Sequence, residues 1–187
     1  MTDTQNKPST RDRLIRAALE LFQMRGYHAT GVSEILTRAH CPKGSLYHHF
    51  PGGKSELAVA AIEWLESQMI AHFDAGRDKA VPAHKQVTLL FRQTSDWVSG
   101  AGFGVGALLS VMAQEVVPDD AVLTQRLGAA YAKAIAHFDQ ALQAGGASGD
   151  MAGPIIAMLD GAVAQARAQT SPAPFDMSLT AALRLLE

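Results

Sequence analysis

The chain has 187 residues, of which 48% are hydrophobic, and its formal net charge at pH 7 is -2. This composition excludes a disordered chain, and the single cysteine, Cys41, excludes an internal disulfide and a cysteine-based metal cluster. The N-terminus is polar, and no apolar run approaches the roughly 18 residues of a membrane span. We therefore expect a cytoplasmic protein with no membrane partner.

Charge is distributed unevenly along the sequence. Residues 1–56 carry eight Lys and Arg against five Asp and Glu, whereas residues 57–187 carry eight against thirteen. A basic segment joined to an acidic one is typical of a protein that meets a phosphate backbone at one end only. Ordinary charge scatter is the alternative explanation for this pattern taken alone.

The first part of the chain predicts a group of short helices followed by a long one. Apolar residues at helical spacing indicate a helix over about 10–25, which Ser9 caps and Gly26 ends. A short helix follows Thr30-Gly31 and runs through Ala39. After a turn at His40-Cys41-Pro42 come the remaining helices of this part, expected at 43–50 and about 54–76.

The rest of the chain predicts five more helices and no strand. A glycine-rich joint at 100–106 and a second glycine-rich loop at 145–149 interrupt them. The helices are expected at about 83–98, 108–117, 120–144, 154–170 and 176–186. The expected fold is all-α, with nine helices in two domains: a three-helix head with a helix-turn-helix arrangement (1–53) and a C-terminal helical bundle (54–187).

The segment 43–50 carries the functional signal. Leu46 and Phe50 lie one helical turn apart and are expected to face inward, which leaves polar side chains on the outer side. Such side chains donate to phosphates and base edges in a DNA groove. The predicted DNA-binding residues are Thr30, Pro42, Lys43, Gly44, Ser45, Tyr47, His48 and Lys54. Among them, Thr30 and Lys54 are expected to contact the phosphate backbone.

This stretch resembles the DNA-binding domain of TetR-family transcriptional regulators. The family pattern K-G-x-L-Y-x-H-F stands here at residues 43–50 and is followed by Lys54. Pro42 and the spacer 51–53 are similar to the LmrA/YxaF-type subgroup, and His40 stands where the family commonly has glycine. The resemblance implies a homodimer, a recognition helix in the major groove of each palindromic half-site, and a cavity for a small inducer.

The bundle offers candidate residues for the cavity and for the dimer interface. Residues of the cavity are expected among large apolar side chains, because ligand pockets have mostly apolar walls. These candidates are Trp64, Phe91, Trp97, Phe103, Met112, Tyr131, Phe138 and Met158.

The last two helices are apolar on more than one face, which predicts that they pack against a second chain as well as against their own. The interface candidates are Ile155, Leu159, Ala162, Val163, Ala166, Leu179, Leu183 and Leu186.

Several residues admit a second interpretation. Tyr47 could be a core aromatic, and Glu115, if it faces inward, would favour a cationic or hydrogen-bond-donating ligand. A metal site at His48 and His49 is rejected, because adjacent helical residues point about 100° apart and no further ligand has suitable spacing. A phosphate loop ending at Lys54 fails as well, because His48 stands where its first glycine belongs.

We therefore expect a repressor, without a cofactor, that binds double-stranded DNA and releases a palindromic operator when a small lipophilic or aromatic inducer binds. A shift between two conformations would rotate the helix at 54–76 and change the spacing of the two heads. One alternative is a dimeric DNA-binding regulator without a ligand. Another is an all-α carrier or enzyme, but the chain lacks a convergent catalytic set of side chains, and we expect no enzyme.

Overall fold

The computed structural model describes residues 8–187, and within that range the chain forms nine α-helices and no strand. In chain order the helices are α1 (Thr10–Arg25), α2 (Val32–Arg38), α3 (Ser45–His49), α4 (Gly53–Asp78), α5 (Ala83–Gly100), α6 (Leu108–Val116), α7 (Ala121–Ala144), α8 (Ala152–Gln169) and α9 (Ala173–Arg184). The predicted all-α fold is confirmed for this range. The first seven residues of the predicted head lie outside it.

Most helices differ from their predicted bounds by one to three residues, and two of the differences have clear local reasons. Helix α3 begins at Ser45 and not at residue 43, because Ser45 N donates to Pro42 O at 3.0 Å and closes a turn before the helix. Helix α9 begins at Ala173, three residues early, with Pro174 inside its first turn. A proline is tolerated there because the first helical N–H groups have no partner within the helix.

Caps and glycines set the ends of α1. The side chain of Ser9 accepts a hydrogen bond from Asp12 N at 3.1 Å, which satisfies one unpaired donor of the first turn. Gly26 ends the helix with φ of 83°, a backbone conformation that suits glycine. His40 has φ of 52° in the turn between α2 and α3. His40 therefore adopts the left-handed backbone conformation that glycine usually adopts in such a turn.

Buried side chains form two cores. The lower core joins α1, α2 and α3 to the adjoining ends of α4, α6 and α7; Phe22, Leu46, Leu57, Met112 and Leu123 belong to it. The upper core lies among α4, α5, α7, α8 and α9, and Phe73, Phe91, Phe138, Ile155 and Ala182 belong to it. The lower core thus crosses residue 54, where the sequence predicts the domain boundary. Head and bundle are packed together through this core.

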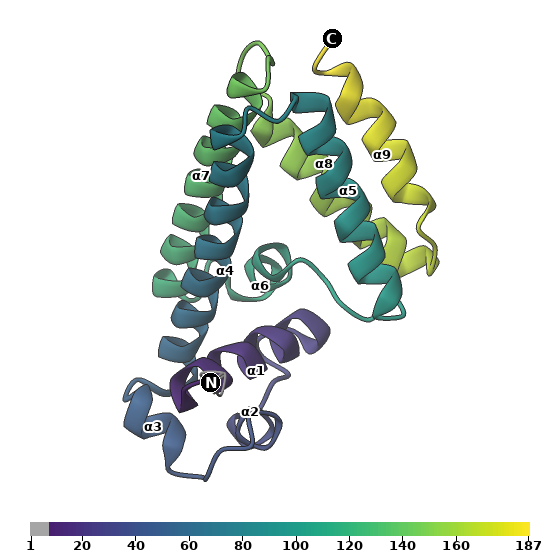
Figure 1. Ribbon diagram of the computed structural model, residues 1–187. Coiled ribbons are helices and arrows are strands. Elements are labelled where there is room, and N and C mark those ends of the chain that lie inside the picture. The colour runs from purple at the N-terminus through teal and green to yellow at the C-terminus, as the bar shows by residue number, and fades with distance from the viewer. Residues whose placement is uncertain (1–7) are drawn as a thin grey trace, which may run out of the picture.

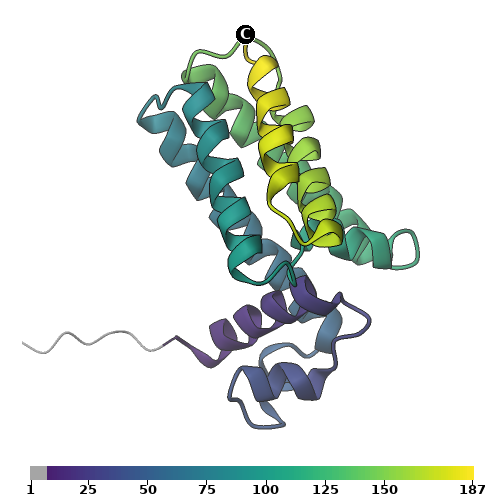
Figure 2. The ribbon, with the colours of Figure 1, turned by 90° about the vertical axis from the view of Figure 1, so that its right-hand side faces the viewer.

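The long helices give the molecule its shape (Figure 1). Helices α4 and α7 lie side by side and run in the same direction away from the head, while α5, α8 and α9 form the other side of the bundle. Helix α6 lies between these two sides, directly above α1. The view turned by 90° shows α9 on the outside of α8, with the three short helices of the head at the opposite end from the C-terminus (Figure 2).

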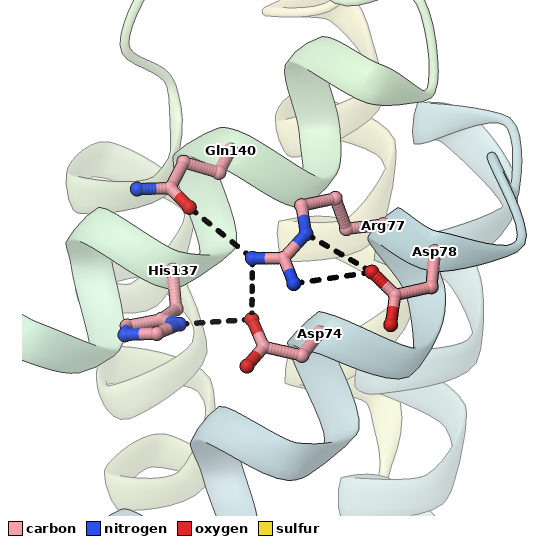
Figure 3. A network of polar contacts seen from close by, with 5 residues as sticks. All are labelled: Asp74, Arg77, Asp78, His137 and Gln140. Atoms are coloured by element: carbon pink, nitrogen blue, oxygen red, sulfur yellow. Dashed lines mark hydrogen bonds and ion pairs between the residues drawn. The ribbon is translucent and has the colours of Figure 1, made fainter.

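Polar contacts tie α4 to α7 along their shared length. His137 Nδ1 and Arg77 Nη1 each lie 2.9 Å from Asp74 Oδ1, and Arg77 also donates to Gln140 Oε1 at 3.3 Å (Figure 3). The hydrogen bond with His137 and the charge of Arg77 hold the pKa of Asp74 below its ordinary value. These contacts fix the axial position of α4 relative to α7.

A second cluster lies closer to the head. The carboxylate of Glu66 is 8% exposed and accepts hydrogen bonds from Arg126 at 2.7 Å and from Lys133 at 3.0 Å. Burial raises the pKa of Glu66, but these two hydrogen bonds and the charges of Arg126 and Lys133 together leave the pKa below its ordinary value. Glu66 is therefore an ionised link between α4 and α7.

Within residues 8–187, none of the helices combines the length and the apolar composition that crossing a lipid bilayer would require.

Candidate DNA-binding surface and ligand cavity

Helix α3 presents two different sides. Leu46 and Phe50 are 0% and 1% exposed and anchor the helix in the lower core. Tyr47 is 60% exposed, and Lys43 and His48 are also exposed. The inward and outward placement predicted from helical spacing is thus found, and the interpretation of Tyr47 as a core aromatic is wrong. The outer side carries a cation, a phenol and an imidazole, all groups that form hydrogen bonds with DNA.

The turn before α3 completes this exposed surface. Pro42 and Gly44 are exposed, and a Cβ placed on Gly44 would meet no atom within 4 Å. Ser45 is half-buried at the first position of the helix. Six predicted DNA-binding residues therefore gather on one continuous surface, which comprises Pro42, Lys43, Gly44, Ser45, Tyr47 and His48; we call it the α3 surface.

Two other predicted DNA-binding residues lie inside the head. Thr30 is 1% exposed, and its hydroxyl donates to Gly26 O at 2.7 Å. Lys54 Nζ donates to Tyr27 O at 3.1 Å and to Thr30 O at 3.2 Å, and it lies 4.3 Å from the centre of the Tyr27 ring. Their predicted role as phosphate contacts is wrong for this conformation. Lys54 instead holds the segment between α1 and α2 against α4, and Thr30 closes that segment from within.

Ion pairs use part of the positive charge of the head. Arg25 pairs with Glu34, and Arg38 pairs with Glu20 at 2.7 Å. Lys43 belongs to no ion pair among the described residues. The α3 surface therefore carries an exposed positive charge that is free to approach an anion.

A cavity of about 200 Å³ lies within the bundle, and α1, α4, α5, α6, α7 and α8 all contribute to its wall. Two of the predicted cavity residues, Trp97 and Tyr131, line it. The others that line it are Gln23, Leu65, Met69, Phe73, Leu90, Thr94, Ala107, Leu108, Leu109, Ile156, Leu159, Asp160 and Val163. An apolar wall with a few polar groups is the usual form of a small-molecule site.

The remaining predicted cavity residues lie elsewhere. Phe91 and Phe138 fill the upper core and Met112 the lower core, each at most 1% exposed. Trp64 packs on the lower core with Arg16 5.9 Å above its ring, Met158 packs on the upper core, and Phe103 borders a shallow surface hollow near Arg167. Their assignment to the cavity is wrong, because none of them lines it.

A polar pair that the sequence analysis missed lies on the cavity wall. Tyr131 Oη donates to Asp160 Oδ2 at 2.6 Å. Burial raises the pKa of Asp160, and burial together with this hydrogen bond raises the pKa of Tyr131 above its ordinary value. A lone acidic residue in the apolar first half of α8 was the available signal.

The predicted dimer residues are mostly used within the chain. Ile155, Ala162, Val163 and Ala166 are at most 3% exposed in the upper core, and Leu159 lines the cavity. Leu179, Leu183 and Leu186 are half-buried against the same core. Ile155, Ala162, Val163 and Ala166 are therefore covered within the chain itself, whereas an interface role of Leu179, Leu183 and Leu186 stays a prediction.

The same two helices do present another exposed side. Exposed small residues recur along α8 at helical spacing, and exposed apolar residues also occur on α9. The exposed residues of this side are Ala157, Ala164 and Ala168 on α8, and Met177, Ala181 and Leu185 on α9; we call it the α8/α9 face.

The head and α6 are joined by direct hydrogen bonds. Glu115 Oε2 accepts from His28 N at 2.8 Å, and Gly106 N donates to Gln23 O at 2.9 Å. The carboxylate of Glu115 reaches the head because Gly26 has no side chain: a Cβ there would lie 1.7 Å from Glu115 Oε1. The alternative in which Glu115 faces a ligand is not found, since its carboxylate contacts the loop between α1 and α2.

Comparison with known proteins assigns both parts of the chain. A family model described as bacterial regulatory proteins, tetR family, matches residues 14–61. A second, described as the C-terminal domain of LmrA/YxaF-like transcriptional regulators, matches residues 83–180.

Curated relatives match over part of their length. The uncharacterized HTH-type transcriptional regulator YxaF of Bacillus subtilis is 33% identical over 110 residues, which is 56% of this chain and 57% of that protein. The HTH-type transcriptional regulator LmrA of the same organism is 40% identical over 75 residues, 38% of this chain and 40% of that protein. The chain thus spans about half the length of these relatives.

Solved structures share the whole fold. The regulatory protein TetR from Rhodobacter sphaeroides superposes with a TM-score of 0.76 at 28% identity, covering 95% of this chain and 99% of that one. A structure of a cysteine mutant of the TetR family regulator CifR with double-strand operator DNA superposes with a TM-score of 0.77 at 21% identity over 100% of both chains.

Proposed function

Because the chain belongs to the TetR family of bacterial regulatory proteins and has an LmrA/YxaF-like C-terminal domain, we propose that it is a ligand-responsive, DNA-binding repressor of transcription. In this proposal a homodimer binds a palindromic operator and releases it when a small lipophilic or aromatic molecule enters the cavity. The observation that carries the proposal is the α3 surface, which is exposed while the opposite side of α3 is anchored in the lower core.

The α3 surface suits the major groove of DNA in both size and chemistry. The groove is about 12 Å wide and admits one helix with its side chains. Lys43 at the start of the helix meets a phosphate, while Tyr47 and His48 reach the sugar-phosphate wall and the base edges. Leu46 and Phe50 hold the helix rigidly, so that little conformational freedom is lost on binding.

The α8/α9 face supports the proposal of a homodimer. Met177 is 60% exposed and Leu185 is 36% exposed, and small residues along α8 allow a second helix to approach closely. An exposed apolar face of this kind marks an interaction site. A two-fold axis through it would hold two α3 surfaces on the same side of one DNA duplex, as a palindromic operator requires.

Contacts between the cavity and the head support control by a ligand. Gln23 of α1 lines the cavity, and its carbonyl accepts the hydrogen bond from Gly106. Helix α6 contributes Leu108 and Leu109 to the cavity and holds the head through Glu115. A ligand that moves α6 or α1 therefore changes the position of the head, and a ligand preferring one position shifts the population toward it.

Two alternatives follow from the sequence analysis. A regulator without a ligand would need no open space in the bundle, and the cavity of about 200 Å³ therefore supports the proposal of a ligand. The alternative of a carrier or an enzyme does not agree with the matched families, which are regulators of transcription. We therefore keep the ligand-responsive repressor as the proposed function.

The test is a footprint of the purified protein on the DNA that flanks its own gene. We expect protection of an inverted repeat, with two chains bound for each repeat, and increased transcription of the adjacent gene when the regulator is deleted. Protection without two-fold symmetry, or no protection at all, would contradict the proposal. Decreased transcription after deletion would contradict the repressor assignment.

A further inference from the structure

The cavity holds one ionisable pair on otherwise apolar walls. Asp160 of α8 and Tyr131 of α7 both line it and are joined by a hydrogen bond of 2.6 Å. The other described lining residues, from α1, α4, α5, α6 and α8, have no ionisable side chain. Asp160 is therefore the residue of the described wall that is able to carry a charge at neutral pH.

The carboxylate of Asp160 has fewer partners than it can bind. An ionised carboxylate accepts up to about four hydrogen bonds, and within residues 8–187 the Tyr131 hydroxyl supplies one. Around it lie apolar side chains such as Ile156, Leu159 and Val163. A charge placed in such surroundings without a partner costs free energy, and a bound cation lowers this cost.

We propose that the cavity selects a small lipophilic cation, a protonated amine on an apolar or aromatic body, with its ammonium group bound to Asp160. This inference rests on the proposed function, and it specifies in addition that the inducer carries a positive charge. An ammonium group supplies up to three N–H donors to the carboxylate. An anionic ligand would meet a like charge in a medium of low dielectric constant, which is unfavourable.

Aromatic side chains add to the selection of a cation. Phe73, Trp97 and Tyr131 all line the cavity, and the face of an aromatic ring attracts a nearby cation. Because burial and the neighbouring Asp160 raise the pKa of Tyr131, its hydroxyl stays protonated and keeps donating to the carboxylate. This hydrogen bond holds the carboxylate in place for a cation that enters from the cavity.

The size of the cavity limits the body of the ligand. Its volume of about 200 Å³ lies below the roughly 300–1,000 Å³ of typical drug-sized pockets. A molecule with one aromatic ring and a short alkyl amine fits this space better than a multi-ring drug. The proposal therefore concerns small aryl-alkyl amines.

The experiment compares three probes that share one body and differ in charge. Calorimetric titration of the whole protein at neutral pH uses 4-phenylbutylamine, 4-phenylbutan-1-ol and 4-phenylbutanoate. We expect the amine to bind at least about tenfold more tightly than the alcohol and the carboxylate to bind most weakly. In Asp160→Asn the preference for the amine disappears, whereas Asp176→Asn on the exposed side of α9 keeps it.

A second measurement needs no variant. Burial raises the pKa of Asp160, so its carboxylate takes up a proton at a higher pH than an exposed aspartate does. Tyr131, the other ionisable group at the wall, stays neutral as the pH is lowered. The amine remains charged over this range, so its advantage over the alcohol should fall as the pH is lowered. A pH-independent advantage would overturn the proposal.

Other outcomes also overturn it. These are equal or tighter binding of the alcohol, no measurable binding of the amine, or an amine preference that survives in Asp160→Asn. Operator binding without a probe is measured separately and tests the proposed function. If the neutral alcohol released the DNA as well as the amine does, the ligand-responsive repressor would be supported and the preference for a cation would be overturned. If the protein preferred the amine but bound no DNA, the preference for a cation would be supported and the proposed function would be overturned.

Discussion

The head and the upper bundle bury similar apolar side chains but place their functional groups in opposite ways. In the head, α3 is anchored from within by Leu46 and Phe50, and the polar groups lie outside on the α3 surface. In the bundle, the polar pair of Tyr131 and Asp160 lies on the wall of a partly open cavity between the helices. A surface that reads DNA needs exposure, whereas a site for a lipophilic molecule needs exclusion of water.

The largest effect is expected from emptying either core. Phe22→Ala and Phe138→Ala each remove a side chain that is at most 1% exposed, and each should lower the free energy of unfolding by about 3–5 kcal/mol. Because the lower core includes residues of α6 and α7, Phe22→Ala should still unfold in one transition. Urea unfolding followed by circular dichroism measures this. A head that melts alone in Phe22→Ala would show that the lower core does not couple the two regions.

A smaller loss is expected where α4 and α7 share a buried charge. Glu66→Gln leaves Arg126 without its full partner and should cost about 2–3 kcal/mol at neutral pH. The pKa of Glu66 is lowered in the folded chain, so its stabilisation is complete above the pKa of the unfolded state. It is lost as the pH falls through the folded-state pKa. Unfolding at a series of pH values should therefore show the variant and the parent converging in acid; a constant difference would contradict this.

The contact between the two regions is tested by a pair of glycines. Gly26→Ala puts a side chain at a φ of 83° and against Glu115, and should cost about 2 kcal/mol. Gly128→Ala, on an exposed turn of α7 with no atom within 4 Å, should stabilise by about 0.5–1 kcal/mol. Denaturant midpoints compare the two variants. Equal shifts would mean that the head does not need the space for Glu115.

The smallest effects separate two lysines of the head. Lys43→Ala should leave stability unchanged but reduce the slope of log affinity against log salt by about 2 for a dimer, one for each copy. Lys54→Met should lower the free energy of unfolding by about 1–2 kcal/mol through its lost carbonyl contacts and leave the salt slope unchanged. Operator titrations at several salt concentrations provide the slopes. If Lys54→Met reduced the slope as much as Lys43→Ala, Lys54 would be a phosphate contact after all.

The head was largely predictable because its signals are local. Helical spacing alone separates Leu46 and Phe50 from Tyr47 and His48, and the structure agrees. The failures in the head, Thr30 and Lys54, concern tertiary partners. Lys54 binds carbonyls of residues 24 and 27 positions away, and no spacing rule predicts such a contact.

The bundle was less predictable because helical spacing indicates which side of a helix faces inward but not whether the space there is filled. Phe91 and Phe138 face inward into close packing, whereas Trp97 and Tyr131 border open space. Ile155 and Val163 were similarly assigned to a partner chain, although the chain's own helices cover them. Neither difference can be derived from a single sequence, since both depend on how several helices meet.

The claim that the α3 surface contacts DNA is tested most directly by the affinity of Tyr47→Ala for the footprinted operator, measured by fluorescence anisotropy. Tyr47 is 60% exposed, so the variant should keep its helical spectrum and its unfolding midpoint. The loss of two contacts for each dimer should weaken operator binding by at least about tenfold. The control variant Lys85→Ala, at an exposed position of α5, should leave operator binding unchanged. An affinity equal to that of the parent protein would show that α3 does not lie in the groove.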